Sequence, residues 1–171
     1  MFVDEAGFSL LPMAVRTYAP AGQTPILKIP FTRDHLSAIG AMTLEGKICM
    51  QTQDHSYKGP DVVRFLQLLL REIPGKLLVI WDGASIHRSQ PVKDFLTKGG
   101  AKRIHLERLP AYAPELNPQE GVWNLLKRVE LKNVCCLDVP HVQRELHRAK
   151  ERLRHRKPVL RQCFAHAGYS L

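Results

Sequence analysis

The first third of the chain alternates short apolar runs with glycine and proline turns, a pattern that is typical of β-strands. We predict strands at the start of the chain and at residues 35–43 and 47–53, the last two being paired across a turn at 44–46. Weaker strand-like runs lie at residues 13–18 and 25–30. Together they predict an antiparallel meander.

Residues 59–131 alternate between helical and strand patterns. Apolar residues spaced three or four apart predict a helix that begins near Gly59 and ends at Pro74 and Gly75. The continuous apolar run 76–81 predicts a strand buried on both faces. Further elements are predicted as a helix at 89–98, a strand at 104–109 and a helix at about 119–131, which Asn117 and Pro118 begin.

The last part of the chain is helical and basic. Asp138 caps a predicted helix, and a short helix follows at about 160–167. The long helix has an apolar stripe of Val139, Val142, Leu146, Ala149 and Leu153. Its remaining positions carry Arg144, Arg148, Lys150, Arg152 and Arg154.

This order of elements predicts the fold class. Three antiparallel strands followed by parallel strands and helices describe an α/β protein, with one ribonuclease H-like mixed sheet and helices on both faces. A flavodoxin-like or Rossmann sheet would alternate from the start and carry a GxGxxG loop, and the sequence has neither.

Composition excludes several classes of protein. The 171 residues are 44% apolar and 24% charged, and no apolar run reaches the ~20 residues of a membrane helix. Four cysteines without a CxxC motif fit neither a disulfide framework nor a zinc site. We therefore expect a reduced, cytoplasmic protein with no membrane partner.

The formal net charge is +9, and most of it lies near the C-terminus. Residues 121–171 hold eleven Lys and Arg against four Asp and Glu. Such a basic segment indicates a polyanionic partner, with nucleic acid favoured over a membrane. A solvated helical face rich in arginine is the alternative.

Three carboxylates stand at places where functional residues gather in open sheets. Asp4 ends the first strand, Asp82 ends the buried strand, and Glu120 lies in the first turn of a helix. Converging carboxylates repel one another unless cations lie between them, and oxygen ligands suit Mg²⁺ or Mn²⁺. Singly, each has an ordinary structural explanation as a strand-end, N-cap or first-turn acid.

The sequence around these acids resembles the DDE superfamily endonucleases, in particular the mariner-like transposases of bacterial insertion sequences. The resemblance rests on FVDEAGF at 2–8, WDGASIHRS at 81–89 and LPAYAPELNPQEGVW at 109–123. It places the catalytic, metal-binding triad on Asp4, Asp82 and Glu120. Many relatives carry Asn where this chain has Gly83.

The resemblance implies metal-dependent cleavage of DNA at the ends of a mobile element, followed by strand transfer to target DNA. It implies two Mg²⁺ or Mn²⁺ ions when DNA is bound, double-stranded DNA as partner, a homodimer on DNA and a bacterial, nucleoid-associated location. Since relatives carry a helix-turn-helix portion before the first catalytic strand, that portion is expected on a separate polypeptide, or the chain is a truncated form.

The domain organisation expected from these features is a catalytic domain at 1–135 and a basic helical extension at 136–171, packed on the same domain. His87 and Arg88 are candidate phosphate contacts, and His87 is equally a candidate to orient a metal ligand or a helix-start residue. Two other functions stay open: a non-catalytic DNA-binding remnant of a transposase, and a ribonuclease H-like nuclease or resolvase.

Overall fold

The structure, a computed structural model, describes residues 1–28, 32 and 34–170. One mixed sheet has the strand order β3-β2-β1-β4-β5. β2 runs antiparallel to β1 and β3, whereas β4 runs parallel to β1 and β5. The predicted mixed sheet is therefore confirmed, with β1 at its centre. The strands are β1 (Phe2–Ser9), β2 (His35–Met42), β3 (Ile48–Gln53), β4 (Leu77–Trp81) and β5 (Ile104–Arg108).

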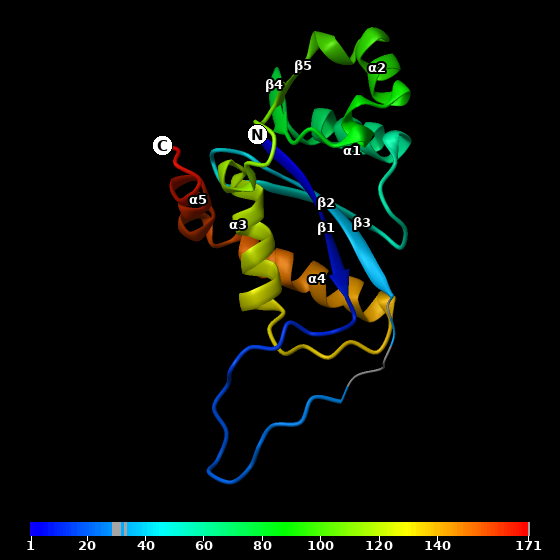
Figure 1. The fold of residues 1–171 in the computed structure, drawn as a ribbon. Coiled ribbons are helices and arrows are strands. Elements are labelled where there is room, and N and C mark those ends of the chain that lie inside the picture. The colour runs from blue at the N-terminus through cyan, green and yellow to red at the C-terminus, as the bar shows by residue number, and fades with distance from the viewer. Residues whose placement is uncertain (29–31, 33, 171) are drawn as a thin grey trace.

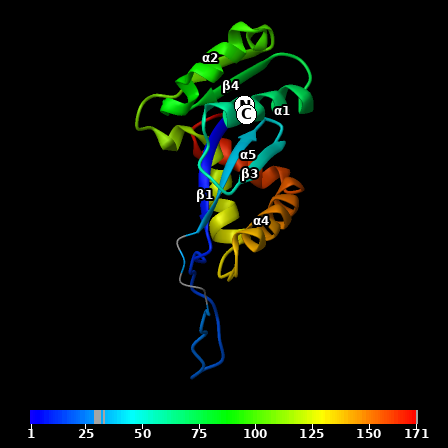
Figure 2. The ribbon, with the colours of Figure 1, turned by 90° about the vertical axis from the view of Figure 1, so that its right-hand side faces the viewer.

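Helices cover both faces of the sheet (Figures 1 and 2). α1 (Gly59–Glu72) and α2 (Gln90–Thr97) cover one face. α3 (Pro118–Leu125), α4 (Val139–Arg154) and α5 (Lys157–His166) cover the other. In the described ranges, no helix combines the length and the apolar character that a bilayer crossing requires. The predicted helices are all found, within a few residues at their ends.

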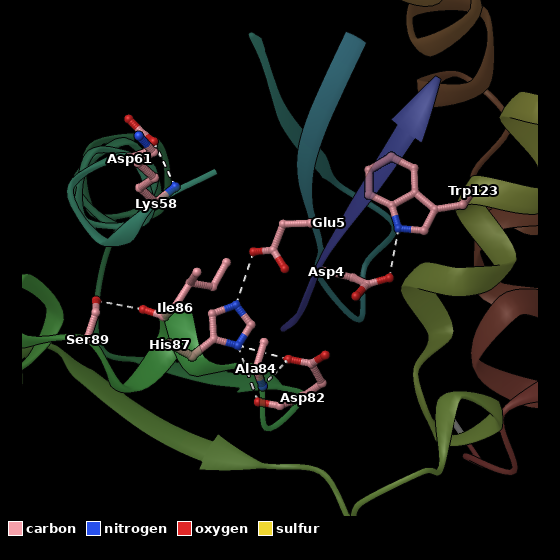
Figure 3. A network of polar contacts seen from close by, with 10 residues as sticks. All are labelled: Asp4, Glu5, Lys58, Asp61, Asp82, Ala84, Ile86, His87, Ser89 and Trp123. Atoms are coloured by element: carbon pink, nitrogen blue, oxygen red, sulfur yellow. Dashed lines mark hydrogen bonds and ion pairs between the residues drawn. The ribbon is translucent and has the colours of Figure 1, made fainter. Parts of the chain in front are cut away.

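Alternation along β1 sends its side chains to two separate cores. Phe2 and Phe8 pack among α3, α4 and α5, whereas Val3 packs among α1 and α2. The same alternation points Asp4 toward α3 and Glu5 toward the opposite face. Figure 3 shows these two neighbours diverging from the strand.

The sheet divides between β1 and β4. These two parallel strands share only the register pair Phe2 and Ile80, while β1 stays paired to β2 along its whole length. Asp4 and Asp82 follow this single pair, where the strands separate: Asp82 directly follows β4, whereas β1 continues past Asp4 to Ser9 and does not end at Asp4 as predicted, because its pairing with β2 continues. The division leaves room for side chains and for a pocket between the two carboxylates.

The segment between β1 and β2 differs from the prediction. Residues 13–18 and 25–28 form no strand, and residues 29 and 30 of the second run lie outside the described residues. Instead of a strand, Asn133 holds this segment, since its side chain accepts a hydrogen bond from the Val15 amide at 2.8 Å and donates one to the Val15 carbonyl at 3.0 Å. Met13, Val15 and Tyr18 are exposed, so the run has no apolar surface to pack on.

Helix α3 approaches β2 very closely at Gly40. A Cβ atom at this position would lie 2.6 Å from Gln119 Nε2 and 2.6 Å from Trp123 Cη2, both on buried side chains. Only a glycine allows this approach without displacement of the helix. The first turn of α3 is set by Asn117, whose side chain accepts a hydrogen bond from the Gln119 amide at 3.1 Å.

We therefore expect Gly40→Ala to lower the free energy of unfolding by about 1–3 kcal/mol, because overpacking forces Gln119 and Trp123 to move. Chemical denaturation measures the change. Gly7→Ala on the neighbouring strand is the matched control, since a Cβ there has no neighbour within 4 Å. Equal stability of the two variants would contradict the close approach.

Candidate active site

An open pocket of about 390 Å³ lies at the division of the sheet. Asp4 from β1, Asp82 from the end of β4 and Glu120 from the first turn of α3 all line it. The rest of its wall comes mainly from Gly83 and Ala84, from Arg108, and from the loop that joins β5 to α3. The structure thus brings together the three carboxylates that the sequence singles out.

Asp4 is the most buried of the three carboxylates, with 9% of the residue exposed. Trp123 Nε1 donates a hydrogen bond to its Oδ2 at 2.9 Å (Figure 3). Burial, together with the negative charge of Glu120, raises the pKa of Asp4 to about 7, even though the Trp123 hydrogen bond opposes the rise. A cation bound beside Asp4 would stabilise the charged form of this carboxylate.

Asp82 is held by the turn that follows it. Its Oδ1 accepts a hydrogen bond from the Ala84 amide at 2.9 Å and lies 3.0 Å from His87 Nδ1. The side chain is half exposed to the pocket. The turn leads into the short 3₁₀ helix η1 (Ser85–Arg88), which carries His87 back beneath Asp82.

His87 connects the two strands across the division of the sheet (Figure 3). Its Nε2 lies 3.0 Å from Glu5 Oε1, its Nδ1 faces Asp82, and its ring stacks on Trp81 with centroids 4.2 Å apart. Burial favours the neutral ring, but the hydrogen bond to Glu5 and the nearby negative charges raise the pKa of His87. Both ring nitrogens face oxygens that accept, so the imidazolium satisfies both contacts.

The oxygens left without protein donors suit a hard divalent cation. Among the described residues, Asp4 Oδ1 and Asp82 Oδ2 have no hydrogen-bond partner, because each aspartate is held by its other oxygen. Glu120 adds a third carboxylate on the same pocket. An all-oxygen donor set fits Mg²⁺ or Mn²⁺. Within the described ranges, no three His, Cys, Asp or Glu side chains are yet close enough to hold one ion.

The other candidate contacts lie apart from this pocket. Arg88 is exposed on η1 and does not line it, and His87 is buried beneath Asp82. On α4 the apolar stripe faces the core, and four of the five basic side chains are exposed. Most of these basic residues are already paired: Arg148 with Glu145, Lys150 and Arg154 with Glu151, and Arg152 with Glu130.

Two side chains hold the site through contacts that the sequence did not predict. Trp123 is recognisable as an apolar anchor of α3, but its donation to Asp4 depends on the close approach of α3 to β2. Glu5 is an acidic neighbour of Asp4, and its contact with His87 joins residues 82 positions apart. The only signal for Trp123 is its spacing of three from Glu120, which places both on one side of a helix.

Comparisons with known proteins identify a matching family and a shared fold. The family model described as DDE superfamily endonuclease matches residues 1–138. Among curated proteins, no sequence matches the chain. Three solved structures share the fold, with 13–19% identity and 99% of this chain covered.

Two of these structures are complexes with the Mos1 transposase. The mariner Mos1 paired end complex with Mg has a TM-score of 0.64 and 19% identity, and the Mos1 strand transfer complex has 0.62 and 16%. This chain spans 56% and 55% of their lengths. The third is the catalytic domain of Mos1 mariner transposase, with a TM-score of 0.55 and 13% identity over 83% of that chain. At these identities the likeness establishes the ribonuclease H-like fold.

Proposed function

The chain belongs to the DDE superfamily endonucleases, and on that premise we propose that it cuts DNA with divalent cations held by Asp4, Asp82 and Glu120. The observation that carries the proposal is the shared pocket, which three carboxylates line from three separate elements. Mn and Mg appear in the names of Mos1 paired end complexes, which supports the same cations here.

The residues of this chain supply placement. Trp123 fixes one oxygen of Asp4, and His87 with the Ala84 amide fixes one oxygen of Asp82, so that the second oxygen of each is left for a cation. Glu120, which lines the same pocket from the first turn of α3, would complete the set. Bound cations would supply activation of an attacking oxygen and neutralisation of charge on the leaving oxygen.

We propose hydrolysis followed by strand transfer as the reaction. In the first step a water oxygen attacks phosphorus and the 3′ oxygen leaves with a proton, which frees a 3′-hydroxyl. In the second, a 3′-hydroxyl attacks a phosphodiester of target DNA, so that one P–O bond forms as another breaks. The relatives in complex with transposon ends and in a strand transfer complex support this pair of steps. The partner in this proposal is double-stranded DNA, which implies action at the nucleoid. A homodimer on DNA belongs to the same proposal.

The packing of the last two helices supports a proposal for the domain organisation. We propose a catalytic domain at 1–135 and a basic extension at 136–171 that packs on it. Support comes from Leu146, Leu153 and Phe164, which are fully buried in the same core as Phe2 and Trp123. The extension therefore contributes both to stability and, through its outer face, to DNA binding.

The outer face of α4 predicts unequal contributions to DNA affinity. Arg144→Gln should reduce the slope of log affinity against log salt by about 0.9, the value for one lost phosphate contact. Arg152→Gln should change the slope less, because Glu130 already holds Arg152 at 2.7 Å. Fluorescence anisotropy with a labelled duplex measures both slopes. Unchanged affinity and slope in both variants would indicate that this face is a solvated helical face that does not contact DNA.

Nicking of supercoiled plasmid tests the proposed function. We expect nicked circles in Mg²⁺ or Mn²⁺, none in EDTA, and joining of an oligonucleotide with a free 3′-hydroxyl to the plasmid. DNA that is bound but never cut would favour the non-catalytic remnant. Preferred cutting of branched DNA or of RNA–DNA hybrids, without joining, would favour the nuclease or resolvase.

A further inference from the structure

The guanidinium group of Arg108 lies in the candidate active site, in the space that a side chain at position 83 would otherwise fill. It is the last residue of β5 and lies opposite Trp81 in the parallel register, next to Asp82. A Cβ atom on Gly83 would lie 2.5 Å from Arg108 Nε, 2.6 Å from Nη2 and 2.7 Å from Cζ. The guanidinium group therefore packs directly on the glycine backbone, on the wall of the pocket.

This guanidinium has no ionic partner in the part of the chain that the structure describes. None of the ion pairs or side-chain hydrogen bonds there involves Arg108, although it lines the same pocket as Asp4, Asp82 and Glu120. By contrast, Arg103 on the same segment donates three hydrogen bonds to backbone carbonyls. Arg103 has a structural role, and the donors of Arg108 are available to a ligand.

The charges of the pocket indicate what that ligand is. One side carries carboxylates that suit divalent cations, and the other carries an unpaired planar cation. A phosphodiester is attracted to both. Guanidinium groups bind phosphate oxygens through two parallel hydrogen bonds, which neutral or smaller cationic side chains do not reproduce.

We propose that Arg108 binds a phosphate of the DNA strand that lies in the pocket, and that Gly83 makes room for its guanidinium group. This inference rests on the proposed function, since it assumes that DNA enters the pocket. It assigns Gly83 a role in the site through the absence of a side chain. Substitutions at positions 83 and 108 are thus expected to have non-additive effects on DNA binding.

Binding of a labelled DNA duplex in Ca²⁺ over a range of salt concentrations tests this assignment. Arg108→Gln should weaken binding roughly 10-fold and reduce the salt slope by about 0.9. Arg108→Lys should keep the slope and recover only part of the affinity, since a lysine keeps the charge and loses the paired hydrogen bonds. The control is Arg71→Gln, which removes an exposed arginine of α1 that does not line the pocket.

A double-mutant comparison tests the shared space. Gly83→Ala should weaken DNA binding in the wild-type background, because it displaces the guanidinium group, and should have no further effect in Arg108→Gln. Thermal melting shows whether each variant is folded. A loss of folding would leave the salt slope of DNA binding unchanged, whereas the loss of a phosphate contact reduces it. Equal affinity and slope in Arg108→Gln and Arg71→Gln would overturn the inference while wild-type nicking still supports the proposed function. A wild type that neither binds nor nicks DNA would overturn both.

Discussion

Asp82→Asn is expected to slow Mg²⁺-dependent nicking of supercoiled plasmid on the order of 10³-fold, with little change in stability. Loss of a metal-binding carboxylate removes several kcal/mol of transition-state stabilisation, and about 4 kcal/mol corresponds to that factor. The asparagine keeps an oxygen that accepts from the Ala84 amide, so the turn after β4 stays intact. Nicking rates and melting temperatures measured on the same preparations separate the two effects.

Glu115→Gln is the matched control for this variant. Glu115 is an exposed acid in the loop before α3 and does not line the pocket. Its replacement removes the same negative charge outside the pocket, so nicking should stay within about twofold of wild type. A nicking rate of Asp82→Asn equal to that of the control would remove Asp82 from the site.

Asp4→Asn is expected to stabilise the metal-free protein at pH 8 by about 2–4 kcal/mol. Burial and the charge of Glu120 together raise the pKa of Asp4 from 3.8 to about 7, so the native state binds a proton that the unfolded state releases. The stability of the wild type therefore falls as pH rises from about 4 to about 7. Asparagine has no charge to bury and still offers an oxygen to Trp123 Nε1.

The comparison of the two proteins across pH isolates this one group. Their free energies of unfolding should agree near pH 4 and differ most at pH 8, as measured by denaturant titration in EDTA. Added Mg²⁺ should then stabilise the wild type more than the variant, because a cation that binds only the native state favours it. A variant less stable than wild type at pH 8 would contradict the buried charge.

The sheet and the carboxylates could be predicted because their signals are local. The apolar run before Asp82, the turn at 44–46 and the Asn117 cap each specify backbone geometry within a few residues. The topology then requires that β1 and β4 lie side by side, which brings Asp4 and Asp82 to one edge. Family resemblance and topology indicate the same residues for independent reasons.

The rest of the site depends on contacts between distant segments. The link from Glu5 through His87 to Asp82 forms only because β1 and β4 separate after one register pair. The donation from Trp123 to Asp4 requires the glycine at position 40 of β2. Likewise the strand-like run at 13–18 has alternating residues but no neighbouring strand, since Asn133 takes its hydrogen bonds. No local pattern encodes these pairings.

Anomalous X-ray scattering from crystals soaked in MnCl₂ tests most directly whether the three carboxylates form one metal site. We expect a manganese peak in the pocket, within coordination distance of Asp4 and Asp82 and facing Glu120. The peak should be lost in crystals of Asp82→Asn. Manganese bound only elsewhere on a protein that nicks DNA in MnCl₂ would contradict the assignment of Asp4, Asp82 and Glu120 as the metal-binding residues.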